Sequence, residues 1–181
     1  NERIRVNWLD NNLGIAGNTD KAFEISKGEY CGLLDHDDFL EPDALYEVVK
    51  KLNEFPYDCL YTDEDKYDSS KDIYCDPNFK PDFAIDSLRS HNYITHFFVA
   101  RKKMLESVGF EHSEFDGAQD YDLILRCIEK SNKVGHICRS LYHWRMHSGS
   151  TAENPAQKMY CYKAGKKALE AHFERLEISA D

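Results

Sequence analysis

Short apolar runs alternate with stretches of helical spacing in the first third of the chain, and this order limits the possible folds more than any other feature. The predicted strands are residues 4–9, 30–34 and 58–62, and the predicted helices between them are residues 15–27 and a helix that begins at Pro42. Strands that alternate with helices over short connections favour a mainly parallel sheet with helices on its faces. We therefore expect an α/β fold.

The helix that begins at Pro42 has the clearest pattern in the chain. Its residues Leu45, Val48, Val49 and Leu52 fall at i, i+3, i+4 and i+7, which places them on one helical face. We expect this face to pack on the sheet.

The rest of the chain is predicted with less regular patterns. Residues 63–80 are polar, contain a proline and have no period, so we expect a long surface loop. The later predicted elements are a short helix at 83–88, a strand at 94–100, a helix at 102–108, a loop at 110–117, a helix from Gln119, short strands at 134–138 and 141–146, and a long helix at 155–176. We expect one domain over residues 1–181, with an α/β core at 1–154 and a C-terminal helix and tail at 155–181.

Composition excludes several classes of function. A formal net charge of -10 argues against broad attraction to nucleic acid or to an anionic membrane. The six cysteines are scattered and form no CxxC pair, so their spacing suggests neither a zinc site nor a disulfide framework, and we expect reduced thiols in a cytoplasmic protein. No apolar run approaches the roughly 18 residues of a transmembrane helix.

An acidic cluster follows the strand predicted at residues 30–34. Asp35, Asp37 and Asp38 stand within four residues, at the strand end where open α/β sheets bind ligands. Such carboxylates can hold a divalent cation against a phosphorylated substrate. The alternative is a solvated turn whose charge suits the following helix N-terminus. A calcium EF-hand is disfavoured because Phe39 and Leu40 occupy its fifth and sixth positions.

Two further clusters carry chemistry. Asp120 and Asp122 open a predicted helix, where a carboxylate is either a general base or only a first-turn acid that the helix dipole favours. His143, Arg145 and His147 alternate along a predicted strand and therefore share one side, as either a solvated face or partners for phosphate and metal.

A third acidic run, at residues 63–65, has no evident partner in the sequence and is interpreted as solvated.

In this order the motifs resemble the family 2 glycosyltransferases, particularly those that build bacterial cell-surface polysaccharides. The similar segments are residues 12–18, 28–38, 80–82, 92–94, 117–123 with Arg126, and 141–145 with His147 and Ser150. Each motif alone is weak, but the ordered set is specific and runs from about residue 6 to residue 170. Two features depart from the family pattern: Gln119 replaces the usual acid before the catalytic aspartate, and no first β-α-β unit precedes Asn1.

The resemblance implies a GT-A-like, Rossmann-like fold with a mixed, mainly parallel sheet that lacks this first β-α-β unit. It implies inverting, metal-dependent transfer of a sugar from a nucleotide-sugar donor to a hydroxyl of a glycan or lipid-linked acceptor, in cell-surface polysaccharide or glycolipid synthesis. The implied roles are Asp120 as catalytic base; Asn12, Gly14, Asp35 and Arg145 at the donor; Asp37 and His147 at Mg²⁺ or Mn²⁺; and Asn92 and Tyr93 at the acceptor.

The missing unit leads us to expect a fragment that is inactive alone, from a parent enzyme at the cytoplasmic face of the membrane. The alternatives are a non-catalytic carbohydrate-binding or degenerate transferase module and a metal-dependent phosphohydrolase. The donor sugar, nucleotide, acceptor, linkage and oligomeric state are not specified by these motifs.

Overall fold

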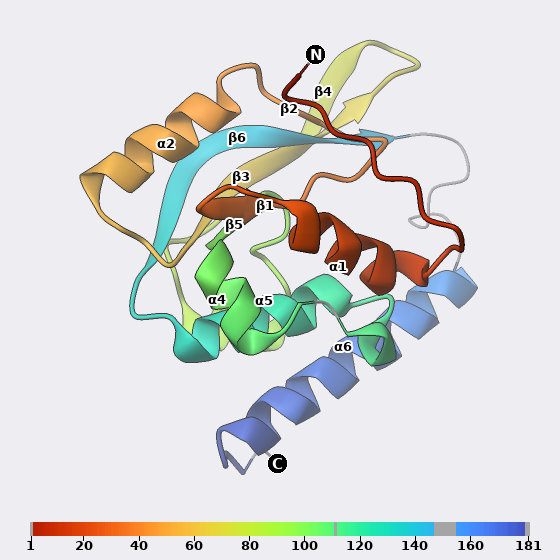
Figure 1. Cartoon of the computed structure of the whole chain (residues 1–181), viewed down its shortest axis with the longest axis vertical. Coiled ribbons are helices and arrows are strands. Elements are labelled where there is room, and N and C mark those ends of the chain that lie inside the picture. Colours follow the sequence, from red (N-terminus) through yellow and green to blue (C-terminus); the bar gives the residue numbers. More distant parts are fainter. Residues whose placement is uncertain (1, 111, 147–154, 180–181) are drawn as a thin grey trace.

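The structure is a computed structural model that describes residues 2–110, 112–146 and 155–179, with the side chains of residues 155–158 left aside (Figure 1). The helices are α1 (Gly14–Ile25), α2 (Ala44–Glu54), α3 (Ile85–Ser90), α4 (Lys102–Val108), α5 (Gln119–Lys130) and α6 (Pro155–Arg175), with a 3-10 turn at Ser113–Phe115. The strands are β1 (Tyr30–Gly32), β2 (Phe39–Leu40), β3 (Cys59–Asp68), β4 (Ile73–Asn78), β5 (Phe98–Arg101) and β6 (Val134–Met146).

All the predicted helices are present, and α3 begins two residues later than expected. The predicted strand at residues 4–9 is wrong, because this segment forms no strand in the described structure and exposes Ile4, Val6 and Trp8. Apolar spacing alone does not make a strand when no neighbouring strand supplies backbone hydrogen bonds.

The six strands form one mixed sheet in the order β1-β5-β3-β6-β2, with β4 paired to β3. The prediction of a mainly parallel sheet is wrong: within the described residues only β3 and β6 pair in parallel, and the other pairs are antiparallel. The prediction assumed that strands consecutive in sequence become neighbours. Instead β5 enters between β1 and β3 and runs opposite to both.

The predicted loop at residues 63–80 is also wrong, because β3 continues to Asp68 and returns as β4 in a hairpin. The two short strands predicted at 134–146 form the single strand β6, which pairs with β3 along its length. The segment at residues 63–80 is polar and without a period, whereas the one at 134–146 is largely apolar but was predicted with a break at residues 139–140. Their mutual backbone pairing, which joins residues about 75 positions apart in sequence, stabilises them as strands.

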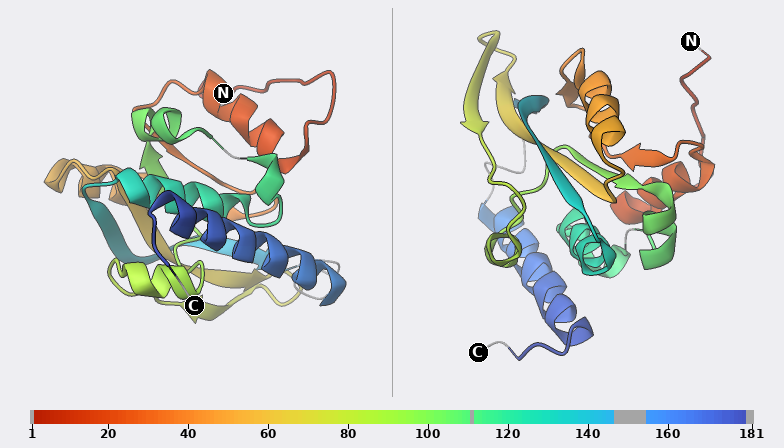
Figure 2. Two further views of the ribbon diagram at one scale, coloured as in Figure 1. Left: turned by 90° about the horizontal axis from the view of Figure 1, so that it is seen from below. Right: turned by 90° about the vertical axis from the view of Figure 1, so that its left-hand side faces the viewer.

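Helices cover both faces of the sheet (Figure 2). On one face, buried residues of α1, α3, α4, α5 and α6 belong to one core cluster with Cys59 and Tyr61 of β3, and on the other, α2 belongs to a second cluster with Leu60. This alternation is the period-two pattern of a strand. The predicted inner face of α2 is half correct, because Val48 is buried and Leu52 partly buried, whereas Leu45 and Val49 are exposed.

No helix in the described part of the chain has both the length and the hydropathy needed to cross a membrane.

Candidate active site

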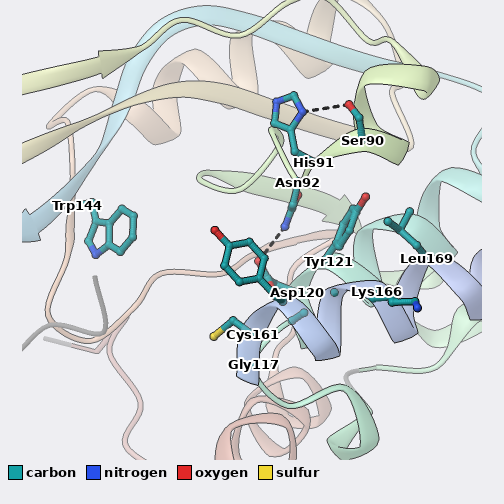
Figure 3. Close-up of a pocket in the computed structure, with 13 residues that line it drawn as sticks. Ser90, His91, Asn92, Gly117, Asp120, Tyr121, Trp144, Cys161, Lys166 and Leu169 are labelled. Atoms are coloured by element: carbon teal, nitrogen blue, oxygen red, sulfur yellow. Dashed lines mark hydrogen bonds between the residues drawn. The ribbon is translucent and has the colours of Figure 1, made fainter. Parts of the chain in front are cut away.

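Asp120 lies at the start of α5, where the preceding chain and the loop after α3 fix its carboxylate. Its Oδ2 accepts a hydrogen bond from Asn92 Nδ2 at 3.1 Å (Figure 3). It also accepts one from Thr95 Oγ1 at 3.0 Å. Asp122 is different, since it is fully buried and its Oδ2 accepts a hydrogen bond from Arg126 Nε at 2.8 Å. Of the two first-turn acids, Asp120 is therefore the one placed for chemistry.

Two cavities meet at Asp120. The smaller has a volume of about 290 Å³, and its lining includes Asp35, His96 and Asp120. The larger, of about 690 Å³, is lined by Asp120 together with Asn92 and the aromatic side chains of Trp144 and Tyr162 (Figure 3). A carboxylate shared by a polar cavity and a largely apolar one is placed to act on two different molecules.

His96 and Glu64 form a charged pair beside the smaller cavity. His96 Nδ1 lies 3.2 Å from Glu64 Oε2, and the His96 amide donates to the same oxygen. Lys80 Nζ lies 3.7 Å from this oxygen and donates to the carbonyl of Ile94 at 3.0 Å. The Lys80 ammonium is fully buried, and this burial lowers its pKa to about 8 although Glu64 and Asp63 favour its charge.

The charges of this pair change both pKa values. Burial alone would lower the pKa of His96, but Glu64, with Asp120 and Asp35, raises it above its usual value. Burial alone would raise the pKa of Glu64, but His96 and Lys80 lower it. The site therefore favours an imidazolium cation at His96, which suits an anionic ligand in the smaller cavity.

The acidic loop at residues 35–38 is held by β6. Tyr142 donates its hydroxyl proton to Asp38 Oδ2 at 2.5 Å, and the Arg145 amide donates to Asp38 Oδ1 at 2.8 Å. Arg145 Nε donates to the carbonyl of Asp37 at 2.7 Å, and its guanidinium lies over the ring of Phe39. Asp38 is thus a structural acid that fixes the loop.

Asp35 and Asp37 keep accessible carboxylates, with side-chain exposures of 63% and 35%. Burial, with the neighbouring charges of Asp38, Asp37 and Asp120, raises the pKa of Asp35, although His96 Nε2 lies 3.9 Å away and lowers it. A carboxylate whose ionised form is disfavoured by its neighbours gains from a bound cation. Oxygen donors on an exposed loop fit Mg²⁺ or Mn²⁺, so the residues present suit the metal that the sequence implies.

Of the two predicted metal ligands, the described structure includes Asp37 only. Asp37 lies on the acidic loop, and His147 lies outside the described residues. Within the described chain, Asp35 and Asp37 do not converge with a third acidic, His or Cys side chain at ligand spacing.

The strand that carries Arg145 was predicted to align His143 with it. Both side chains contact the ring of Phe39, so they share a side as predicted. His143 is buried, with Nδ1 2.6 Å from Asp65 Oδ1 and Nε2 2.9 Å from Glu41 Oε2, and these contacts make it a structural residue of the sheet.

The remaining predicted residues fall in three settings. Asn12 Oδ1 accepts hydrogen bonds from the Gly14 amide at 2.9 Å and from Asn18 Nδ2 at 3.1 Å. Asn12 and Gly14 therefore shape the exposed start of α1. Asn92 lines the larger cavity. Tyr93 is buried, its hydroxyl accepts from the Ala84 amide at 2.9 Å, and it lines neither cavity at Asp120.

Sequence reasoning missed several residues of the site. Thr95 and His96 line the smaller cavity and Glu64 holds His96, yet each stands in a segment that was predicted as a plain strand or a solvated run. The only sequence signal for these residues was the segment at 80–82, which contains Lys80 and resembles a motif of the family 2 glycosyltransferases. The partners lie 16 and 32 residues apart in sequence, so local spacing could not pair them.

A mixed α/β sheet flanked by helices, with a carboxylate between two cavities and acids on an exposed loop, is the arrangement of an enzyme-like α/β domain. Residues 1–109 match the family described as Glycosyl transferase family 2, and the chain belongs to that family.

Two similar proteins are much longer than this chain. The chain is 42% identical over 176 residues to the uncharacterized protein y4gI of Sinorhizobium fredii, covering 96% of this chain and 19% of that protein. It is 39% identical over 180 residues to the O-antigen biosynthesis protein RfbC of Myxococcus xanthus, covering 99% and 14%. The chain thus spans less than a fifth of these relatives.

A solved structure shares the fold. S. aureus TarS 1–349 in complex with UDP-GlcNAc matches with a TM-score of 0.71 at 14% sequence identity, over 98% of this chain and 51% of that one.

Proposed function

We propose that this domain transfers a sugar from a nucleoside-diphosphate donor to a hydroxyl of a growing cell-surface glycan or glycolipid, with inversion at the anomeric carbon. Three findings support the proposal: membership of the glycosyltransferase family, similarity to an O-antigen biosynthesis protein, and a fold shared with a protein solved with UDP-GlcNAc. We place the reaction at the cytoplasmic side of the membrane.

The observation that carries the proposal is the position of Asp120 between two cavities of different character. Glycosyl transfer needs one base that reaches the acceptor while the donor's anomeric carbon lies next to it. Asn92 and Thr95 orient the Asp120 carboxylate by donating hydrogen bonds to its Oδ2.

The smaller cavity is assigned to the donor. A divalent cation held by Asp37, with Asp35 beside it, would stabilise negative charge on the diphosphate as it leaves. The guanidinium of Arg145 and the imidazolium favoured at His96 add positive charge beside these acids. Both bind phosphate oxygens well.

The larger cavity is assigned to the acceptor. Its aromatic walls offer apolar surface to sugar rings, and Asn92 offers an amide at the edge that borders Asp120. In the reaction Asp120 takes the acceptor hydroxyl proton, the acceptor oxygen bonds to the anomeric carbon, and the carbon–oxygen bond to the diphosphate breaks. The diphosphate leaves with the electron pair.

Asp120→Asn, made in the polypeptide as its gene encodes it, tests the base. Because general-base help contributes about 10² to 10⁴-fold, transfer should fall by that factor while donor affinity stays near normal. Asparagine keeps an acceptor oxygen for Asn92 and Thr95, so the loop should keep its geometry. The surface variant Asp86→Asn, at an almost fully exposed side chain, is the control. Unchanged turnover in Asp120→Asn would remove Asp120 from the mechanism.

Calorimetry tests the cation. Asp37→Ala should abolish the Mn²⁺-dependent part of nucleotide binding, whereas Asp86→Ala should not. Equal nucleotide binding with and without Mn²⁺ in the unsubstituted protein would remove the metal from the proposal. Phosphate release without an acceptor would indicate a phosphohydrolase, and donor binding without either reaction a non-catalytic module.

A further inference from the structure

Three side chains outside both cavities converge on one point. Asp82 follows β4, and His136 and Cys138 stand two residues apart on β6, where side chains share a face. His136 Nδ1 lies 3.3 Å from Asp82 Oδ1 and 3.5 Å from Cys138 Sγ. All three ligand atoms lie within 4.8 Å of one another, and within the described chain no other group of such residues does so.

The two separations from His136 Nδ1 match those expected between ligands of a tetrahedral zinc site. With Zn–N near 2.0–2.1 Å, Zn–O near 2.0–2.2 Å and Zn–S near 2.3 Å, tetrahedral ligands are separated by about 3.4 Å for N and O and about 3.6 Å for N and S. The measured 3.3 Å and 3.5 Å agree with both values. One carboxylate, one imidazole and one thiolate also make a donor set that zinc prefers over magnesium.

The surroundings of His136 support the same conclusion. Its second nitrogen, Nε2, lies 2.8 Å from Oδ1 of the buried Asp63. Its ring stacks on the ring of Tyr61, with 4.7 Å between the two ring centroids. A proton on Nε2, donated to Asp63, leaves the lone pair of Nδ1 directed at Asp82 and Cys138. Metal-binding histidines typically have such a carboxylate partner, which fixes the tautomer and the ring orientation.

Access and charge also suit an ion. Cys138 is exposed and the Asp82 side chain is 93% exposed, so both reach solvent, while Asp63 and Tyr61 hold the buried ring of His136. His136 and Cys138 also line a separate cavity of about 220 Å³, in which Lys50 and Lys51 are paired with Glu47 and Glu54. A thiolate and a carboxylate would neutralise the two charges of the ion.

We propose that Asp82, His136 and Cys138 form a binding site for zinc or a similar borderline divalent transition metal, with water as the fourth ligand. The ion would fasten the segment between β4 and α3 to β6. Asp63 links this site to Lys80, whose amide donates to Asp63 Oδ1 at 2.9 Å. The site is separate from the acidic loop at residues 35–38 and does not depend on the proposed sugar transfer.

Metal titration of the whole chain tests the proposal. Zn²⁺ affinity is measured by competition with a chromogenic chelator, with excess Mg²⁺ present to occupy oxygen-only sites. One equivalent should bind, and Co²⁺ in its place should give the charge-transfer absorption of a cobalt–thiolate bond. Affinity should fall from about pH 8 to about pH 6, because protons compete for the thiolate and the imidazole.

Two variants remove exposed ligands without disturbing the buried histidine. Cys138→Ser should abolish the cobalt–thiolate band. Asp82→Asn removes a direct ligand, so Zn²⁺ affinity should fall by more than the roughly 10 to 100-fold that loss of an outer-shell partner costs. The matched controls Cys75→Ser and Asp86→Asn should bind Zn²⁺ like the unsubstituted chain. Zn²⁺ should also raise the unfolding midpoint of the controls but not of Cys138→Ser.

Three outcomes would overturn the proposal: no stoichiometric Zn²⁺ binding, a cobalt–thiolate band that persists in Cys138→Ser, or a loss in Cys75→Ser equal to that in Cys138→Ser.

Discussion

Two acidic runs in this chain look alike in sequence and behave differently in the fold. In the run at residues 63–65, each carboxylate has its own histidine: Asp63 pairs with His136, Glu64 with His96 and Asp65 with His143. The side chains of Asp63, Glu64 and Asp65 are 4%, 12% and 14% exposed. In the run at residues 35–38, Asp35 and Asp37 remain accessible at 63% and 35%.

The difference teaches what each run is for. The carboxylates of residues 63–65 each have a histidine partner, and Lys80 also lies beside Glu64, so these acids hold the sheet and its connections together. Burial raises the pKa of Asp35, and the neighbouring charges of Asp38, Asp37 and Asp120 add to this effect. An acidic run that the fold leaves exposed and electrostatically unfavourable is the one suited to an external cation.

The largest effect should come from Glu64→Gln, which removes the carboxylate that His96 and Lys80 share. Breaking a buried pair leaves uncompensated charge, so we expect a loss of about 3 kcal/mol of unfolding free energy at about pH 7. Urea unfolding measures it, with Glu54→Gln at an exposed pair as control.

The pH dependence of that loss is diagnostic. The Lys80 pKa is lowered to about 8, so above this pH the ammonium is neutral and the loss should shrink. His96 acts in the same direction: its raised pKa means that its contribution is present below its unfolded pKa and lost as pH rises through its folded pKa. A loss that does not depend on pH would assign the effect to packing instead.

A smaller effect should follow from adding Mn²⁺ to the chain. A ligand at ten times its dissociation constant stabilises the folded state by about 1.4 kcal/mol. Thermal unfolding should show this gain in the unsubstituted chain and in Asp86→Asn, and should lose it in Asp37→Asn. An equal gain in Asp37→Asn would show that Mn²⁺ binds elsewhere.

The two runs also show where sequence reasoning succeeds and fails. The helices and the strand before Asp35 were predictable because their signals are local: α2 from its apolar spacing after Pro42, and α5 from its stripe at Leu123, Ile124 and Cys127. The acidic loop and Asp120 were found because each lies at the junction of a predicted element. The hydrogen bonds from Asn92 and Thr95 to Asp120 were found only in the structure.

The errors share one cause. The run at residues 63–65 was interpreted as solvated because its histidines lie 32, 73 and 78 residues away, beyond any local pattern. For the same reason β4 was missed and the sheet was predicted as mainly parallel: strand pairing is a long-range property that composition and period do not contain.

The smallest effect, and the one that separates the two runs by sign, is that of Asp35→Asn. The raised pKa of Asp35 means that the folded chain binds more protons than the unfolded chain between the ordinary value of 3.8 and the raised value. Stability therefore falls as pH rises through that window, and the penalty remains above it. Removing the charge should stabilise the chain near neutral pH, by at most about 1 kcal/mol because the side chain is largely exposed.

Glu64 has the opposite sign. Its lowered pKa contributes stability above its ordinary value of 4.5, and this stability is lost as pH falls through the folded value. Difference curves of unfolding free energy against pH should therefore slope in opposite directions for Asp35→Asn and Glu64→Gln at acidic pH, while Asp86→Asn stays flat. If Asp35→Asn instead destabilises the chain near neutral pH, its carboxylate is already balanced within the fold and the acidic loop loses its distinction from residues 63–65.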